Sequence, residues 1–91
     1  MNWREHKKQL MKDPEFREEY EALAPEHRLA SDLIRLRLAR GLTQAQLAAL
    51  LHTRQESIAR LESGSSLPSL STVRRVADAL DADLEINLRP R

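Results

Sequence analysis

One short segment near the middle of the chain constrains its fold more than any other part of the sequence. Thr43 and Thr53 each precede a helix-forming run, so each is predicted to cap the free backbone N–H groups at a helix start. Ile58 and Leu61 are three residues apart and are expected to face inward on the second of these helices. The segment therefore predicts two short helices joined by a tight turn.

The outer face of the second predicted helix is polar. It carries Arg54, Gln55, Glu56, Ser57 and Arg60. A helix that offers Arg, Gln and Ser near its N-terminus suits the major groove of B-DNA, because Arg pairs with guanine edges and Gln with adenine edges. We interpret the segment as a helix-turn-helix motif that binds double-stranded DNA.

Charge is segregated along the chain, although the net charge is only +1. Residues 28–75 hold eight arginines against three acidic residues, whereas residues 1–27 and 76–91 each have an excess of acidic groups. The positive excess thus falls on the helix-turn-helix segment, as a surface that faces phosphates requires. Ordinary solvated helix charge is the alternative explanation.

Composition argues against several other classes of protein. The chain has no cysteine, no secretory signal and no apolar stretch near the ~20 residues of a membrane span, so we expect a cytoplasmic protein with no membrane partner. Its three histidines, His6, His27 and His52, are scattered, and two glycines cannot form a phosphate-binding loop. We expect no enzymatic activity, metal, cofactor or small-molecule substrate.

Helix signals extend the motif to four helices between about residues 25 and 81. Pro25 opens the first helix and Gly41 ends it, Gly64 ends the third, and Ser69 or Ser71 caps the fourth. Residues 25–82 are therefore predicted to form the DNA-binding domain.

The C-terminal residues 83–91 show the pattern of a half-buried strand. Leu84, Ile86 and Leu88 alternate with polar residues, yet no other part of the chain resembles a partner strand. A second copy of the strand would complete the pairing, and the alternative is a frayed tail. The predicted homodimer interface comprises Leu84, Ile86 and Leu88, with Val76 or Leu80 of the fourth helix. Such a dimer would read a palindromic operator.

Residues 1–24 lie outside the predicted bundle and form an N-terminal helical extension. A basic run is followed by Asp13-Pro14, which is expected to open an acidic helix. The segment carries six large apolar side chains: Trp3, Leu10, Met11, Phe16, Tyr20 and Leu23. These side chains would either dock on a partner protein or cover the chain's own helices, and the sequence favours neither.

Several spaced motifs resemble the lambda/434-repressor-like (XRE) family of DNA-binding proteins. They are Gly-Leu-Thr-Gln at 41–44, Leu-Ala at 47–48, Ser-Ile-Ala-Arg-Leu-Glu-Ser-Gly at 57–64, Pro-Ser-Leu at 68–70 and Ala-Asp-Ala-Leu at 77–80. The resemblance covers roughly residues 29–82. It implies an all-α, lambda-repressor-like bundle, to which the N-terminal extension and the short C-terminal dimerisation β-strand are added.

The resemblance also implies roles for individual residues. Arg37 and Glu62 match a structural ion pair, and Gln44 matches a glutamine that contacts phosphate. The DNA-binding set so assigned is Thr43, Gln44, Thr53, Arg54, Gln55, Glu56, Ser57, Arg60 and Ser65. His52 and Asp81 depart from the family pattern, which has Gly at the turn and after the fourth helix, where positive φ is often needed.

The wider arrangement is similar to the HigA-type antitoxins of type II toxin–antitoxin modules. The shared features are a Lys-rich start, Asp-Pro-Glu-Phe with a following Tyr, and a terminal Leu-Glu-Ile-Asn-Leu-Arg-Pro. This resemblance implies a dimer that represses its own operon and inhibits a cognate toxin, a RelE/HigB-like mRNA interferase. We predict that the six large apolar side chains of residues 1–24 contribute to binding that toxin. The alternative is a stand-alone XRE-type repressor that has no toxin partner.

Overall fold

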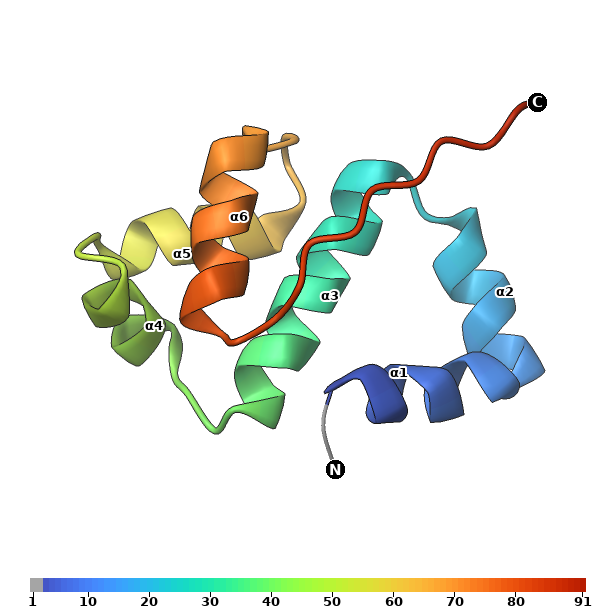
Figure 1. The fold of residues 1–91 in the computed structure, drawn as a ribbon, viewed down its shortest axis with the longest axis horizontal. Helices are drawn as coiled ribbons and strands as arrows, with labels where there is room; N and C mark the ends of the chain where they lie inside the picture. The colour runs from blue at the N-terminus through green and yellow to red at the C-terminus, as the bar shows by residue number, and fades with distance from the viewer. Residues whose placement is uncertain (1–2) are drawn as a thin grey trace.

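The computed structural model describes residues 3–91, without the side chains of Trp3 and Arg4. Within these residues it is all-helical. Its elements are α1 (Trp3–Lys12), α2 (Pro14–Ala22), α3 (Pro25–Ala39), α4 (Gln44–Leu50), α5 (Gln55–Ser63) and α6 (Leu70–Ala79). The long helix α3 lies between the hairpin formed by α1 and α2 and the group α4–α6 (Figure 1). None of the described helices combines the length and apolar character needed to cross a membrane.

Helices α3–α6 share one hydrophobic core, and we call them the bundle. Leu47, Ile58 and Leu80 are each only 1% exposed. The core cluster consists of Leu33, Leu36, Leu47, Ala48, Leu51, Ile58, Val76 and Leu80. Ala48 is small and buried on α4, where α5 crosses closely. The predicted four-helix bundle is confirmed.

Three helices start at the residues that the sequence predicts. Thr43 caps α4 through a capping box, in which its hydroxyl accepts from the Gln46 N–H and the Gln46 side chain accepts from the Thr43 N–H. Ser69 caps α6, and Asp13 caps α2 ahead of Pro14. These local side-chain bonds satisfy backbone donors that the first helical turn leaves open.

Three helix ends share one geometry, in which a left-handed residue follows the C-cap. Gly41, His52 and Asp81 have φ values of 70°, 55° and 54° and follow α3, α4 and α6. After α4, the N–H of His52 donates to the Ala49 carbonyl and the N–H of Thr53 to the Ala48 carbonyl. His52 and Asp81 thus adopt a positive φ, which glycine would adopt with less steric strain.

The predicted cap at Thr53 is wrong. The Thr53 N–H donates to the Ala48 carbonyl at the end of α4. The extended residue that precedes α5 is Arg54, with φ −97° and ψ 152°, so α5 begins one residue later than a Thr53 cap requires, and Arg54 makes no side-chain cap bond.

Gly64 ends α5 in the left-handed conformation, as predicted, and it also permits a close contact. A Cβ at this position would lie 2.5 Å from Nδ1 of His27 in the first turn of α3. Any larger residue would therefore strain the backbone and collide with His27.

The predicted C-terminal strand is not formed. Residues 83–91 run without regular secondary structure across α3 (Figure 1). A strand requires hydrogen bonds to a neighbouring strand, and the described part of the chain supplies none. Leu88 is 95% exposed and Ile86 58%, whereas Val76 and Leu80 are buried in the core. Val76 and Leu80 therefore lie where they cannot contact a second copy of this fold.

Candidate nucleic-acid interface

A buried ion pair anchors the candidate interface. Nε of Arg37 on α3 donates to Oε2 of Glu62 on α5 at 2.7 Å, and Nη2 donates to Oε1 at 2.9 Å. The third bond runs from Nη1 to the Leu42 carbonyl at 2.8 Å, just before α4. The hydrogen bond to Glu62 raises the pKa of Arg37 and outweighs the opposing effect of burial. One arginine thus ties three elements together.

The ion pair continues into a polar chain that reaches the surface. Glu62 also accepts from Nε2 of Gln44 at 3.1 Å, and Oε1 of Gln44 accepts from Nε2 of Gln55 at 3.5 Å. Gln44 is the first residue of α4 and Gln55 is the first residue of α5. The chain Arg37–Glu62–Gln44–Gln55 therefore connects the buried ion pair to the start of both helices, through a short bond to Gln44 and a longer one to Gln55.

The other side chains assigned to DNA lie along α5 and at its two ends, or at the cap of α4. Arg54, Gln55, Glu56 and Arg60 are exposed, while Ser57 is half-buried. Thr43 is exposed but its hydroxyl is occupied by the α4 cap. Ser65 is exposed in the loop after α5 and its hydroxyl accepts from Ser63. The structure thus brings the N-terminal turn of α5 and Gln44 onto one surface and leaves Ser65 at the far end of α5.

Most arginines of the basic segment make side-chain contacts with the chain itself. Arg28 donates to the carbonyls of Glu21 and Leu23, and Arg40 to those of Leu80 and Asp81. Similar internal contacts engage Arg35, Arg37 and Arg75. Among the eight arginines of residues 28–75, Arg54, Arg60 and Arg74 make no side-chain hydrogen bond or ion pair with the described residues. Carbonyl, hydroxyl and ring contacts orient these arginines without neutralising their charge, and among the described residues only Arg37 and Arg40 of this set lie within ion-pair distance of a carboxylate.

The hairpin α1–α2 packs on α3 through polar and aromatic contacts. Asp32 of α3 accepts from Nζ of Lys7 at 3.0 Å, and both of its oxygens lie 3.0 Å from the Tyr20 hydroxyl. The Tyr20 ring stacks on Phe16 and also lies beneath Nζ of Lys7 at 5.0 Å. The guanidinium of Arg35 covers the Phe16 ring at 4.8 Å. Both aromatic rings therefore contact the chain's own helices.

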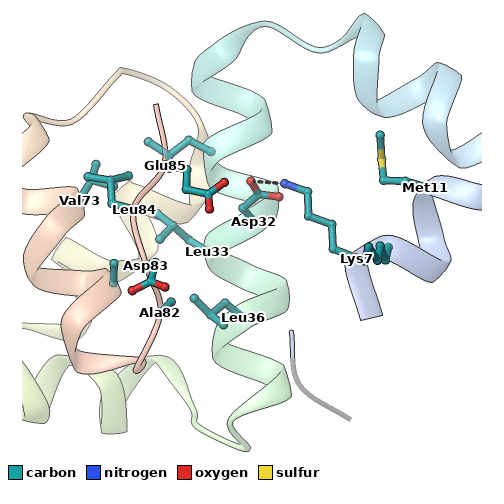
Figure 2. Close-up of a pocket in the computed structure, with 13 residues that line it drawn as sticks. Lys7, Met11, Asp32, Leu33, Leu36, Val73, Ala82, Asp83, Leu84 and Glu85 are labelled. Carbon is teal, nitrogen blue, oxygen red and sulfur yellow. Dashed lines mark hydrogen bonds and ion pairs between the residues drawn. The ribbon is translucent and has the colours of Figure 1, made fainter. Parts of the chain in front are cut away.

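The remaining apolar groups assigned to a partner are only partly covered. Leu10 and Met11 are half-buried, and Leu23 is 37% exposed. The side chain of Trp3 lies outside the described residues. Beside the hairpin, a groove of about 450 Å³ is lined by α1, α3, α6 and residues 82–85, with Leu33, Leu36 and Val73 among its apolar walls and the Lys7–Asp32 ion pair at one side (Figure 2).

The described side chains contain no group of three or more His, Cys, Asp or Glu residues placed to hold a metal ion. Every described buried side-chain nitrogen and oxygen has a hydrogen-bond partner within the chain.

Comparison with known proteins identifies the family to which the chain belongs. The helix-turn-helix family model matches residues 33–87, which include all of α4, α5 and α6. The chain is 34% identical over 85 residues to an uncharacterized HTH-type transcriptional regulator of Haemophilus influenzae, and the match covers 93% of the chain and 83% of that protein.

Two antitoxins of Mycobacterium tuberculosis are similar over shorter shares of their length. Antitoxin HigA1 is 38% identical over 76 residues, covering 84% of this chain and 51% of its own length. HigA2, whose name also describes an antitoxin, is 40% identical over 55 residues, covering 59% and 54%. The chain thus spans about half the length of these two relatives. No solved structure gives a significant match.

Proposed function

Since the chain belongs to the helix-turn-helix family of DNA-binding regulators, we propose that it represses its own operon by sequence-specific binding. We propose further that it acts as a dimer on a palindromic operator and neutralises an mRNA interferase toxin of the RelE/HigB kind. The observation that carries the DNA-binding role is the polar chain from Arg37 to Gln55. It fixes two amides at adjacent helix starts, beside the exposed Arg54.

In this proposal α5 enters the major groove with its N-terminal turn. Arg54 and Gln55 would contact base edges, because their side chains match the donor and acceptor patterns of guanine and adenine. Gln44 would contact a phosphate at the edge of the groove, near the N-terminal end of α4. The buried ion pair would keep these groups in register and would not itself touch DNA.

The test compares substitutions that differ in their expected sequence dependence. Arg54→Ala and Gln55→Ala should each cost about 1–3 kcal/mol on the operator and relax specificity. Gln44→Ala should weaken operator and random DNA more evenly, because a phosphate contact carries no base information. Gln9→Ala, at an exposed glutamine of α1, is the matched control. Equal losses on operator and random DNA for Arg54→Ala and Gln55→Ala would contradict the assignment.

The proposed dimer rests on the segment after Ala82. Leu84, Ile86 and Leu88 alternate with polar residues and are exposed, so pairing with a second copy would bury them and satisfy the backbone groups of the segment. Ile86→Lys should therefore give monomers with much weaker operator affinity, which sedimentation measures. An unchanged dimer in Ile86→Lys would move the interface elsewhere.

The antitoxin role is supported by similarity to HigA1 and HigA2 and by the hairpin that precedes the bundle. The second candidate is a regulator without a toxin, which the Haemophilus influenzae relative favours because it matches over 83% of its length. Contacts of Phe16 and Tyr20 with α3 also favour it, since they leave less apolar surface for a partner.

Co-expression with the product of the neighbouring gene, followed by co-purification, separates these two candidates. An antitoxin should copurify with that product and restore growth when the product is induced. Deleting residues 1–24 should keep operator binding and impair the rescue. Full rescue by the truncated protein would remove the hairpin from the toxin contact, and loss of folding would show that the hairpin serves the bundle.

A further inference from the structure

A second polar surface lies on the side of α5 opposite Gln55 and Glu62, between α5, α6 and the C-terminal end of α4. Gln55 and Glu62 bond toward α4 and α3, whereas Ser57 and Leu61 line a groove against α6. At 3.6 residues per turn, Gln55 and Ser57 lie on roughly opposite sides of the helix. The groove has a volume of about 260 Å³. It is lined by Leu51, Thr53, Ser57, Ile58, Arg60, Leu61, Thr72, Arg75 and Val76.

The polar lining of this groove has the composition of an anion site. Arg60 from α5 and Arg75 from α6 are both exposed, and Thr53, Ser57 and Thr72, which carry hydroxyls, line the same groove. The Thr72 hydroxyl accepts from Ser69, which leaves its proton free to donate to an anion. Guanidinium groups and hydroxyls are among the side-chain groups that contact phosphate oxygens in protein–DNA complexes. No acidic side chain lines the groove, so nothing in it opposes an anion.

Arg75 is held in place by a contact that leaves most of its donors unused. Nη2 of Arg75 donates to the Leu51 carbonyl at 3.0 Å, at the C-cap of α4. A guanidinium has five N–H donors, and this bond uses one of them. The bond therefore positions the group without neutralising it, and little side-chain entropy remains to be lost when an anion binds.

We propose that this groove, through Arg75 with Arg60 and Thr72, binds a backbone phosphate of the DNA strand opposite the one that Gln44 contacts. The proposal rests on the proposed function. A helix with its side chains is about 10–12 Å across and the major groove is about 12 Å wide, so both sides of α5 face a phosphate wall. Gln44 contacts the phosphates at one edge of the major groove, and Arg75 and Arg60 contact those at the other edge.

The test measures how DNA affinity depends on salt, using a random-sequence duplex and the operator duplex. Arg75→Gln removes the charge and keeps an amide that can donate to the Leu51 carbonyl. It should reduce the slope of log K against log salt concentration by about 0.9, the value for one lost phosphate contact. Both duplexes should lose affinity by the same factor. Arg74→Gln removes the same charge from the neighbouring exposed position, which lines no part of the groove, and should change the slope by much less.

A second pair of variants covers the case in which Arg75→Gln fails to fold. Thr72→Glu places a carboxylate in the groove, three residues after the Ser69 cap, where it can complete a capping box and support the helix. Ser71→Glu adds the same charge to the same turn outside the groove. Thr72→Glu should weaken binding to both duplexes several-fold more than Ser71→Glu does.

The outcomes separate this proposal from the function on which it rests. An unchanged salt slope in Arg75→Gln, with wild-type DNA binding intact, would overturn the phosphate site alone. So would equal effects of Thr72→Glu and Ser71→Glu. If inorganic phosphate raises the melting temperature of the wild type but not of Arg75→Gln, while the DNA slope is unchanged, the groove binds a free anion and not DNA. Failure of the wild type to bind either duplex would overturn the proposed function itself.

Discussion

The bundle and the hairpin are both helical, but different forces hold them. Every buried hydrophobic side chain that the structure describes lies between Ala30 and Leu80, inside the bundle. In the hairpin, α2 has no buried residue, and its contacts with α3 depend on Arg28, Asp32 and Arg35. Hydrophobic burial is non-directional and contributes in proportion to area, whereas the hairpin contacts are few and geometrically specific.

Because of this difference, we expect the hairpin to open at a lower free energy than the bundle. A region with a shared apolar core unfolds cooperatively, while a region held by surface polar contacts can open at a lower free energy. The candidate DNA interface belongs to the bundle, because its polar chain begins at the buried Arg37. The hairpin, which carries the candidate partner segment, belongs to the less stable region.

The largest expected effect comes from breaking the buried ion pair of the bundle. Arg37→Ala leaves the Glu62 carboxylate, whose side chain is 5% exposed, without its counter-charge. Removing one partner of a buried pair typically costs about 3–5 kcal/mol of unfolding free energy. Urea denaturation measures the loss, and Arg74→Ala at an exposed arginine is the control. DNA affinity per folded molecule should fall far less than stability. A variant that keeps its melting temperature and loses only DNA binding would make Arg37 a phosphate contact.

The next largest effect is a difference in unfolding free energy between alanine substitutions of two leucines in one helix. Leu47 is 1% exposed and Leu50 is 55% exposed, although both lie in α4. Leu47→Ala should cost about 2–5 kcal/mol, because it removes buried methyl groups and leaves a cavity. Leu50→Ala should stay within about 0.5 kcal/mol, since exposed substitutions rarely exceed that. Thermal unfolding followed by circular dichroism distinguishes them, and similar losses for the two leucines would place α4 differently against the core.

The bundle could be predicted from sequence because its determinants are local and periodic. Thr43, Ser69 and Gly64 act through bonds or backbone angles within a few residues, so their roles follow from spacing alone. The prediction of Thr53 as a cap is wrong because α5 begins one residue later, with Arg54 in the extended N-cap position. The spacing of a single threonine before a helical run does not reveal such a shift of one residue.

Interactions between distant residues could not be predicted in the same way. The contacts of Tyr20 and Lys7 with Asp32 join positions 12 and 25 residues apart, and no periodicity marks them. The groove that Arg75 lines likewise depends on how α6 crosses α5. The prediction of a C-terminal strand is wrong within this chain for a related reason. The alternation at residues 84–88 indicates which side chains would share one face of a strand, but it does not supply a neighbouring strand.

A smaller effect should appear when the contact between hairpin and bundle is cut. Asp32→Ala removes the acceptor shared by Lys7 and Tyr20. Hydrogen bonds to a charged group contribute about 1.5–3 kcal/mol when buried, and the partial exposure of this cluster reduces the expected cost to about 1–2 kcal/mol. Hydrogen exchange should rise in α1 and α2 while the bundle amides stay protected. Asp78→Ala, at an exposed position of α6, should change neither. Uniform loss of protection would mean that hairpin and bundle open together.

The smallest expected effect is a pH dependence of the same contact. Burial raises the pKa of Tyr20 above 10.0, and Asp32 acts in the same direction while Lys7 opposes it. The pKa of Lys7 is also raised, because its interactions with Tyr20 and Asp32 outweigh the effect of burial. A group whose pKa is raised by folding stabilises the folded state below its unfolded pKa, and that contribution is lost as the pH rises through the folded value. The hairpin should therefore loosen only above about pH 10. Because Tyr20 is the chain's single tyrosine, tyrosinate absorbance follows it alone. Its midpoint should lie higher in buffer than in urea, and Asp32→Asn should lower it. Identical midpoints in buffer and urea would show that Tyr20 does not dock on α3 in solution.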